Sequence, residues 1–362
     1  MNFQDFEFRP FIKKLMLRED LTEEDIETSV DLISKGQLSV ASIAAFLVAL
    51  AMKKETPNEI QCLVRSVRKR SVRLTPKHNS PIVDICGTGG DFINTPNIST
   101  AAAVVASGSG VCVAKHGNRS MSGLCGSADF LEHIGFDLGS PLSTILSSIE
   151  KIGIGFIYAP MFHPSMGTVA AARKLIGART VFNIIGPLSN PCTNLAGQVI
   201  GVTDPLLFEK ISTASLNLGL RNVMVVHAHE NIDELSNTGP NDISLKDGKQ
   251  LKRIQLDPKD VNIKSASIDA IKMKTKKQSI KTTLECIYGH AERELLGIVE
   301  LNAAAVLVVA DKVRDIGDGI DLARKSIIEG KARSKLYQLI DRCGQARRLE
   351  EVENELGIRQ QL

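Results

Sequence analysis

Residues 82–106 read IVDICGTGGDFINTPNISTAAAVVA. The apolar run 82–86 predicts a β-strand, and the alanine-rich run 101–106 predicts a helix. Between them lie three glycines and six small uncharged polar residues, which let backbone N–H groups approach an anion. The N-terminus of the following helix adds unpaired donors and partial positive charge. We interpret the segment as a strand, phosphate loop and helix; an ordinary strand-to-helix turn is the alternative.

The spacing within this loop excludes two common phosphate-binding motifs. A P-loop needs a lysine directly after its second glycine, and no lysine lies between Gly87 and Lys115. Counted from Gly89, a dinucleotide fingerprint needs another glycine where the sequence has Phe92. The loop therefore belongs neither to an ordinary NTPase nor to an ordinary dehydrogenase.

A second polar loop follows the next predicted strand, 111–114. It reads KHGNRS over residues 115–120, and GSAD over residues 126–129 then leads into a helix-like run. This loop offers a cation, an imidazole, an amide and a hydroxyl. Two helix N-termini and a lysine would bind an extended polyphosphate better than a single phosphate.

With both loops in view, the chain resembles the anthranilate phosphoribosyltransferase family. The similarity continues, in order and spacing, through Tyr158–Pro164, Arg173–Leu175, Gly177–Asn183, Gly186–Pro191, Asp233-Glu234 and Asn302–Ala304. It covers nearly the whole chain. Members of this family join anthranilate to phosphoribosyl pyrophosphate (PRPP) and release pyrophosphate in tryptophan biosynthesis, and the resemblance implies the same reaction here.

The resemblance also implies a fold: a small all-helical domain plus a larger α/β domain with a mostly parallel sheet, and the active site in the interdomain cleft. The expected helical domain takes residues 1–76 with about 167–190 and forms a homodimer. The expected PRPP-binding α/β domain takes residues 77–166 with about 191–362. Composition alone shows only a switch near residue 78, from helices to β-branched runs that alternate with helices.

The residue patterns predict individual elements of that fold. Strands are expected at 82–86, 111–114, 155–158, 199–202 and 223–227, and later helices at 300–311, 317–329 and 332–341. Residues 245–285 are rich in lysine with weak periodicity, so we expect irregular strands and loops there.

The resemblance assigns roles to residues at matching positions. PRPP is expected to contact Gly87, Thr88, Gly89, Gly90, Asp91, Asn97, Ser99, Thr100, Lys115 and Ser127. Anthranilate is expected to contact Gly87, His116, Asn118, Tyr158, His163, Arg173 and Gly186. Mg²⁺, with two ions per subunit, is expected on Ser99, Asp233 and Glu234, whose oxygens suit this ion.

No residue is assigned as a general acid or base, because an arylamine is already neutral near pH 7. His116 and Arg173 are expected to position the substrate, and catalysis is expected from positioning and leaving-group stabilisation. Phe92, Pro96 and Leu124 depart from the family's usual residues, and many members carry lysine at the last of these positions. These departures concern substrate affinity more than reaction type.

Charge, cysteine content and hydropathy argue against several other classes of protein. The net charge is only +3, from 44 basic and 41 acidic residues, so nothing indicates general attraction to nucleic acid or membranes. Seven scattered cysteines without a Cys-x-x-Cys pair are typical of a reducing compartment and argue against structural zinc. The longest apolar run, 40–52, is shorter than the roughly 20 residues of a membrane span. With no signal-peptide pattern, we expect a cytoplasmic protein.

Two alternative functions remain open at this point. A pyrimidine nucleoside phosphorylase shares the expected architecture but would use a single phosphate. It would not need metal bound to Asp233 and Glu234. A catalytically silent relative that binds nucleic acid would need a basic groove. The basic run Arg65, Arg68, Lys69, Arg70 and Arg73 is more typical of a solvated face or a helix C-terminus.

Overall fold

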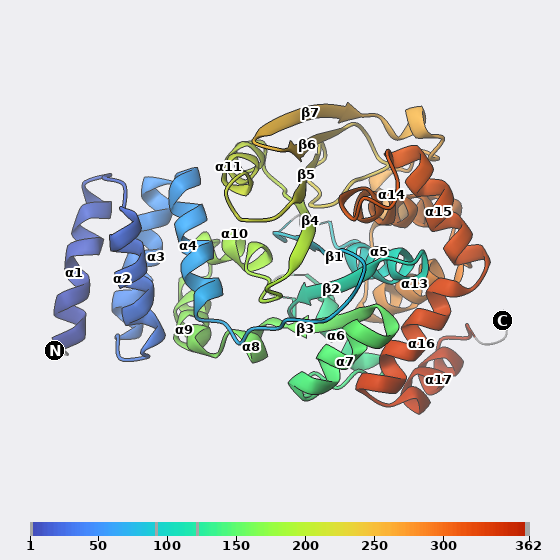
Figure 1. The fold of residues 1–362 in the computed structure, drawn as a ribbon, viewed down its shortest axis with the longest axis horizontal. Helices are drawn as coiled ribbons and strands as arrows, with labels where there is room; N and C mark the ends of the chain where they lie inside the picture. Colours follow the sequence, from blue (N-terminus) through green and yellow to red (C-terminus); the bar gives the residue numbers. More distant parts are fainter. Residues whose placement is uncertain (1–2, 91–92, 121–122, 359–362) are drawn as a thin grey trace. The chain divides into compact units, whose positions relative to one another are not determined.

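The computed structural model describes residues 3–90, 93–120 and 123–358 (Figure 1). The chain divides into two compact units. The smaller unit comprises Met1–Arg73, Ala159–Pro191 and Glu209–Gly219, and the larger comprises Leu74–Tyr158, Cys192–Phe208 and Leu220–Leu362. One unit is helical and the other is α/β, which confirms the predicted fold class.

The smaller unit is built from helices. They are α1 (Phe3–Met16), α2 (Glu23–Ser34), α3 (Val40–Lys53), α4 (Pro57–Lys69), α8 (Ala159–Phe162), η1 (Pro164–Met166), α9 (Gly167–Ile176), α10 (Val181–Leu188) and the end of α11 (Pro205–Ser215). Helix α4 begins with a capping box: the Thr56 hydroxyl accepts from the N–H of Glu59, and Pro57 takes the first helical position. Helix α3 buries Phe46, Leu50 and their neighbours in the core of the unit.

The larger unit contains one seven-stranded sheet in the order β3-β2-β1-β4-β5-β6-β7. Its strands are β1 (Ile82–Gly87), β2 (Cys112–Gly117), β3 (Ile154–Tyr158), β4 (Leu195–Gly201), β5 (Asn222–Ala228), β6 (Asn241–Asp247) and β7 (Gln250–Leu256). The strands β3, β2, β1, β4 and β5 are parallel, and β6 and β7 continue the sheet antiparallel. All five strands predicted from the sequence are present.

The strand order reverses direction between β1 and β4. From β1 the chain proceeds through β2 to β3 on one side, whereas β4 leads to β5 on the other. In open α/β sheets, ligands bind outside the carboxyl ends of the strands at such a point. The topology therefore predicts a ligand site at the carboxyl ends of β1 and β4.

Helices complete the larger unit. They are α5 (Ile98–Gly108), α6 (Ser127–His133), α7 (Leu142–Ile152), η2 (Pro258–Val261), α12 (Ile268–Ile271), α13 (Lys276–Tyr288), α14 (Arg293–Val309), α15 (Ile316–Ile328), α16 (Lys331–Cys343) and α17 (Ala346–Glu355). Helix α5 is buried and contacts α13 to α16, drawn in orange and red in Figure 1. Within the described ranges, every helix is too short or too polar to cross a lipid bilayer.

Two local predictions were wrong. Residues 276–285, where loops and irregular strands were expected, belong to helix α13, which the Thr275 hydroxyl caps by accepting from the N–H of Gln278. Lys115 and His116 belong to strand β2 and are buried, although a loop was expected. The lysine therefore lies within the sheet, where its ammonium group must find acceptors inside the protein.

Candidate functional site

The ends of β1 and β4 are covered by the loop that carries Asp233. A Cβ atom on Gly201 would overlap the carbonyl oxygen of Asp233 and would lie 3.2 Å from its Cα. A Cβ atom on Gly87 would overlap the carboxylate of Asp233. Thr88 N–H also donates to the Gly201 carbonyl over 3.0 Å. Glycine is needed at both strand ends because the Asp233 loop lies directly against them.

The glycine-rich loop binds the Asp233 carboxylate. Gly89 N–H donates to Asp233 Oδ2 over 2.5 Å, although the two residues are 144 positions apart in sequence. Gly89 and Gly90 have φ values of +68° and +85°, which residues with a side chain rarely adopt. The loop and the distant acidic pair predicted from the sequence therefore meet at one point. Asp91 and Phe92 lie outside the described residues.

Lys115 lies beneath the first turn of α5. Its Nζ donates to the Ile85 carbonyl over 2.8 Å and lies 3.4 Å from Ser99 Oγ. The Thr100 hydroxyl is buried and has no hydrogen-bond partner among the described residues. Such a group costs free energy unless a ligand or water satisfies it. The start of α5 thus offers a hydroxyl and a nearby cation to an anion.

Sequence reasoning missed the role of Asp84, a fully buried carboxylate in β1. It accepts hydrogen bonds from His116 N–H at 3.0 Å and from Gln198 Nε2 at 2.9 Å, so it joins β1 to β2 and β4. Burial and this carboxylate raise the pKa of the Cys86 thiol well above its usual value, while Lys115 opposes them. An acidic residue inside an apolar strand was the available signal.

The second polar loop folds back onto the start of α6. Ser127 Oγ donates to the Asn118 carbonyl over 3.2 Å. Asp129 Oδ2 accepts from the N–H groups of Ser120 at 3.0 Å and Gly126 at 2.9 Å. Burial alone would raise the pKa of Asp129, but these donors, together with Arg119 and Lys276, outweigh it and lower the pKa. Asp129, another residue that sequence reasoning missed, therefore fixes the loop that carries Asn118.

Most of the predicted site residues lie at the carboxyl ends of the parallel strands in the larger unit. These are Gly87, Thr88, Gly89, Gly90, Asn97, Ser99, Thr100, Lys115, His116, Asn118, Ser127, Tyr158, Asp233 and Glu234. Tyr158 ends β3, and the Arg119 guanidinium lies over its ring, 6.0 Å from the centroid. This edge of the sheet therefore combines backbone donors, hydroxyls, a cation and two carboxylates.

The other three predicted residues, His163, Arg173 and Gly186, belong to the smaller unit. Burial lowers the pKa of His163 to about 4 and also lowers the pKa of Arg173. A Cβ atom on Gly186 would meet nothing within 4 Å, so crowding among the described residues does not require glycine there. His163 is therefore a neutral imidazole at physiological pH.

The lowered pKa of His163 predicts that the smaller unit loses stability as the pH falls from about 6.5 to about 4. In this range the unfolded histidine binds a proton and the folded one does not, so acid favours unfolding. The free energy of unfolding should fall by up to about 3 kcal/mol from this group. Urea denaturation at several pH values should show a weaker pH dependence in His163→Gln than in wild type. His290→Gln, at an exposed histidine, should keep the wild-type dependence; equal slopes in all three proteins would contradict this prediction.

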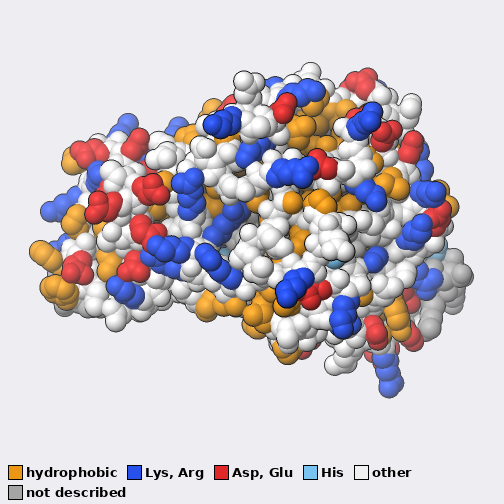
Figure 2. Space-filling view, viewed as in Figure 1, with side chains coloured by type: hydrophobic (Ala, Val, Ile, Leu, Met, Phe, Trp, Pro, Cys, Tyr) orange, Lys and Arg blue, Asp and Glu red, His pale blue; other side chains and the backbone are white. Residues whose placement is uncertain are grey.

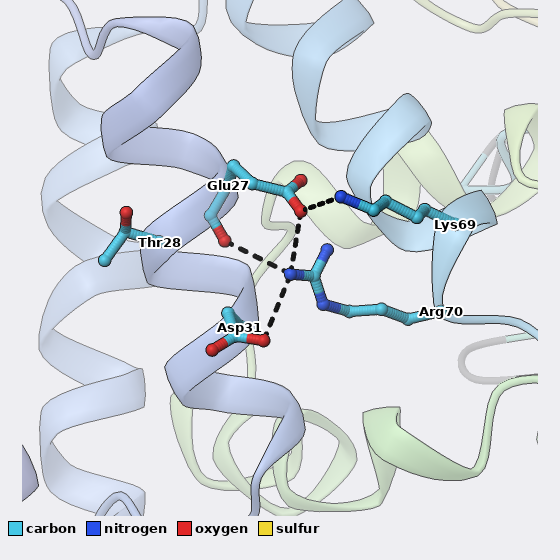
Figure 3. Close-up of a pocket in the computed structure, with 5 residues that line it drawn as sticks. All are labelled: Glu27, Thr28, Asp31, Lys69 and Arg70. Carbon is cyan, nitrogen blue, oxygen red and sulfur yellow. Dashed lines mark hydrogen bonds and ion pairs between the residues drawn. The ribbon is translucent and has the colours of Figure 1, made fainter.

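The basic end of α4 is bound within the smaller unit. Lys69 Nζ lies 2.7 Å from Glu27 Oε1, and Arg70 lies 2.9 Å from Glu27 and 3.2 Å from Asp31, around a depression that Thr28 also lines (Figure 3). Arg70 and then Lys69 lower the pKa of Glu27 to about 2. Figure 2 shows basic and acidic side chains interspersed on its visible face. These contacts favour a structural role for the run over a nucleic-acid patch.

Comparisons with known proteins match both parts of the chain. Residues 9–71 match the family described as "Glycosyl transferase family, helical bundle domain", and residues 79–333 match "Glycosyl transferase family, a/b domain". The chain is 43% identical to an anthranilate phosphoribosyltransferase of Dehalococcoides mccartyi, over 91% of this chain and 96% of that protein.

Solved structures agree with these matches. The crystal structure of the anthranilate phosphoribosyltransferase of Thermus thermophilus superposes with a TM-score of 0.85 at 35% identity, covering 92% of this chain and 99% of that one. The Saccharomyces cerevisiae enzyme in complex with PRPP and Mg gives 0.84 at 25% identity, covering 93% and 98%. The same yeast enzyme in complex with 4-fluoroanthranilate gives 0.84 at 26% identity, covering 94% and 98%.

Proposed function

The chain belongs to the anthranilate phosphoribosyltransferase family, and on that premise we propose that it transfers the phosphoribosyl group of PRPP to the amine of anthranilate, with release of pyrophosphate. The hydrogen bond from Gly89 to Asp233 Oδ2 carries the proposal. It joins the anion-binding loop to the acidic pair at the point where the strand order reverses. A phosphate site and a cation site therefore adjoin.

We propose Mg²⁺ as the cofactor, with two ions per subunit. The Asp233 and Glu234 carboxylates and the Ser99 hydroxyl supply the oxygen donors that this ion prefers. No cluster of three His, Cys, Asp or Glu side chains occurs in the described part of the chain, so substrate oxygens and water would complete the coordination. When bound, the ion neutralises charge on the departing pyrophosphate.

The residues of the larger unit would hold PRPP. Thr100 offers its buried hydroxyl to phosphate oxygens, and the N-terminal end of α5 adds the partial positive charge of a helix start. Lys115 places positive charge beside Ser99 without leaving the sheet. Because the arylamine needs no strong base, these residues would accelerate the reaction by orienting the anomeric carbon and stabilising the leaving group.

We assign the anthranilate to seven residues. They are Gly87, His116, Asn118, Tyr158, His163, Arg173 and Gly186. Arg173 supports this assignment because its planar guanidinium matches a carboxylate. The neutral His163 can orient a substrate without adding charge.

Replacing Arg173 with alanine is expected to raise the KM for anthranilate. Hydrogen bonds to charged groups are typically worth about 1.5–3 kcal/mol, so the increase should be about 10- to 100-fold, with the KM for PRPP changed less than about 2-fold. Steady-state kinetics with each substrate varied in turn will measure both. Lys174→Ala removes a neighbouring, exposed cation from α9 and should behave as wild type. An unchanged KM for anthranilate in Arg173→Ala would remove Arg173 from this role.

We also propose that the smaller unit forms a homodimer. Helices α1 and α3 contact each other, and α3 contacts α9. These three helices expose large apolar side chains, namely Phe3, Phe6, Met16, Val48, Met52 and Leu175. Covering these side chains with a second copy of the chain would remove apolar surface from water.

Loss of anthranilate fluorescence on mixing the protein with anthranilate, PRPP and Mg²⁺ tests the proposed reaction. The expected result is a time-dependent loss that requires all three components. A folded protein that leaves the fluorescence unchanged would refute the proposed reaction. Phosphate-dependent cleavage of pyrimidine nucleosides by the same protein would instead identify a nucleoside phosphorylase.

A further inference from the structure

The loop that carries Asp233 and Glu234 is held by buried asparagines. One of them, Asn302, lies in the middle of α14, far from these carboxylates in sequence. It belongs to the Asn302–Ala304 segment, to which the proposed reaction assigns no role. We propose that Asn302 is a positioning residue that fixes the Asp233–Glu234 pair for metal-dependent binding of PRPP, an inference that rests on the proposed function.

The Asn302 side chain forms a two-point contact with the residue that directly follows Glu234. Its Oδ1 accepts from Leu235 N–H over 3.0 Å, and its Nδ2 donates to the Leu235 carbonyl over 2.7 Å. Nδ2 also donates to the Ile298 carbonyl over 2.8 Å, which fixes the amide against its own helix. Asn302 is fully buried, so water cannot replace these bonds without rearrangement. Both the position and the orientation of Leu235 are therefore set by α14.

The acidic pair is held from both sides. At its first residue, the carbonyl of Asp233 lies against Gly201, at the end of β4. Downstream, Asn302 binds Leu235. The two carboxylates are thus confined between a strand end and a helix, which is how supporting residues orient metal ligands.

Two other asparagines secure the rest of this loop. Asn241 Oδ1 accepts from Ser236 N–H over 2.7 Å, and its Nδ2 donates to the Ser236 carbonyl over 2.8 Å. Asn237 Nδ2 donates to the Glu294 carbonyl over 2.8 Å. These three bonds hold Ser236 and Asn237, which lie farther along the chain from the acidic pair than Leu235 does. Asn302 is therefore the one of the three that contacts the residue adjoining the acidic pair.

Asparagine fits this position because the Leu235 backbone presents one donor and one acceptor. An ionised aspartate is of the same shape but has only acceptors, and a leucine has neither group. Removing the amide would leave two buried backbone groups unsatisfied and would free the loop to move. Loss of a residue that orients a metal ligand typically weakens metal affinity about 10- to 100-fold.

The test compares Asn302→Ala with wild type in two measurements that do not require turnover. Calorimetric titration of Mn²⁺ into protein with PRPP should show affinity weakened by at least about 10-fold in the variant. Hydrogen exchange of the peptide covering residues 230–240 should be faster, because the Leu235 N–H loses its acceptor. The KM for anthranilate should change by less than about 2-fold, because its proposed ligands are untouched.

Asn222→Ala is the matched control. Asn222 Nδ2 donates to the Val309 carbonyl over 3.0 Å, so it joins the start of β5 to the end of α14, away from the loop that carries Asp233. This variant should lose thermal stability without a change in Mn²⁺–PRPP affinity. Should Asn302→Ala fail to fold, Asn302→Asp can be used instead, because it retains the shape and one acceptor. It should also weaken Mn²⁺–PRPP affinity, by a smaller factor.

The proposal is overturned if Asn302→Ala and Asn222→Ala alter Mn²⁺–PRPP affinity equally, or if Asn302→Ala leaves it unchanged. Unchanged exchange over residues 230–240 would overturn it as well. A wild-type protein that binds no Mn²⁺ with PRPP would refute the proposed function itself. That outcome is distinct, because it appears before any variant is made.

Discussion

Replacing Asp233 with asparagine is expected to lower kcat/KM for PRPP by at least about 100-fold, since even residues that only support a metal ligand typically contribute 10- to 100-fold. The substitution preserves the shape of the side chain and an oxygen that can accept the Gly89 N–H. It removes the negative charge that would bind Mg²⁺. Kinetics at several Mg²⁺ concentrations should show that added metal restores only part of the activity.

Asp242→Asn provides the control for this prediction. Asp242 lies in β6 beside the same loop, is partly exposed and pairs with His229 Nε2 at 3.1 Å. It has no proposed ligand, so kcat/KM should remain within about 2-fold of wild type. Equal loss of activity in both variants, or no loss in Asp233→Asn, would contradict the assignment of the metal to Asp233.

Replacing Gly201 with alanine is expected to destabilise the larger unit by about 3 kcal/mol or more, at the upper end of the range for overpacked sites. The added Cβ would overlap the backbone carbonyl of Asp233, which cannot rotate away as a side chain could. Either β4 or the Asp233 loop must move. Denaturant unfolding should report the loss of stability. Titration of Mn²⁺ with PRPP should show weaker Mn²⁺ binding in the folded fraction, because the Asp233–Glu234 pair is displaced.

Gly167→Ala serves as the comparison for the glycine prediction. A Cβ atom there would meet nothing within 4 Å, and the residue begins helix α9 without a positive φ. This substitution should leave stability unchanged or raise it by about 0.4–1 kcal/mol. If Gly201→Ala were as harmless as Gly167→Ala, the close approach of the Asp233 loop to β4 would be wrong.

The sequence predicted the regular parts of the fold because their signals are local. The five short β-branched runs that predicted strands form the five parallel strands of the sheet. Helix α13 was not predicted because its buried face includes the polar residues Ser279, Thr282 and Thr283. These residues, together with the many lysines nearby, hide the spacing of apolar residues that is typical of a helix.

The site was only partly predictable because its contacts are long-range. The acidic pair was identified by resemblance, but nothing local indicated that Gly201 would lie against Asp233 or that Asn302 would bind Leu235. Lys115 was predicted in a loop because its neighbours are polar; register with β3 instead places it inside the sheet. These contacts join residues far apart in the chain and depend on tertiary packing, which a local pattern does not contain.

The most direct test of the central claim is the stoichiometry of the reaction. Wild-type protein with PRPP, Mg²⁺ and anthranilate should consume one anthranilate for each pyrophosphate that phosphorus NMR detects, and chelation of the metal should stop both changes. If PRPP and anthranilate both persist beside folded protein, or if pyrophosphate appears without loss of anthranilate, the claim that this site transfers phosphoribose to anthranilate is contradicted.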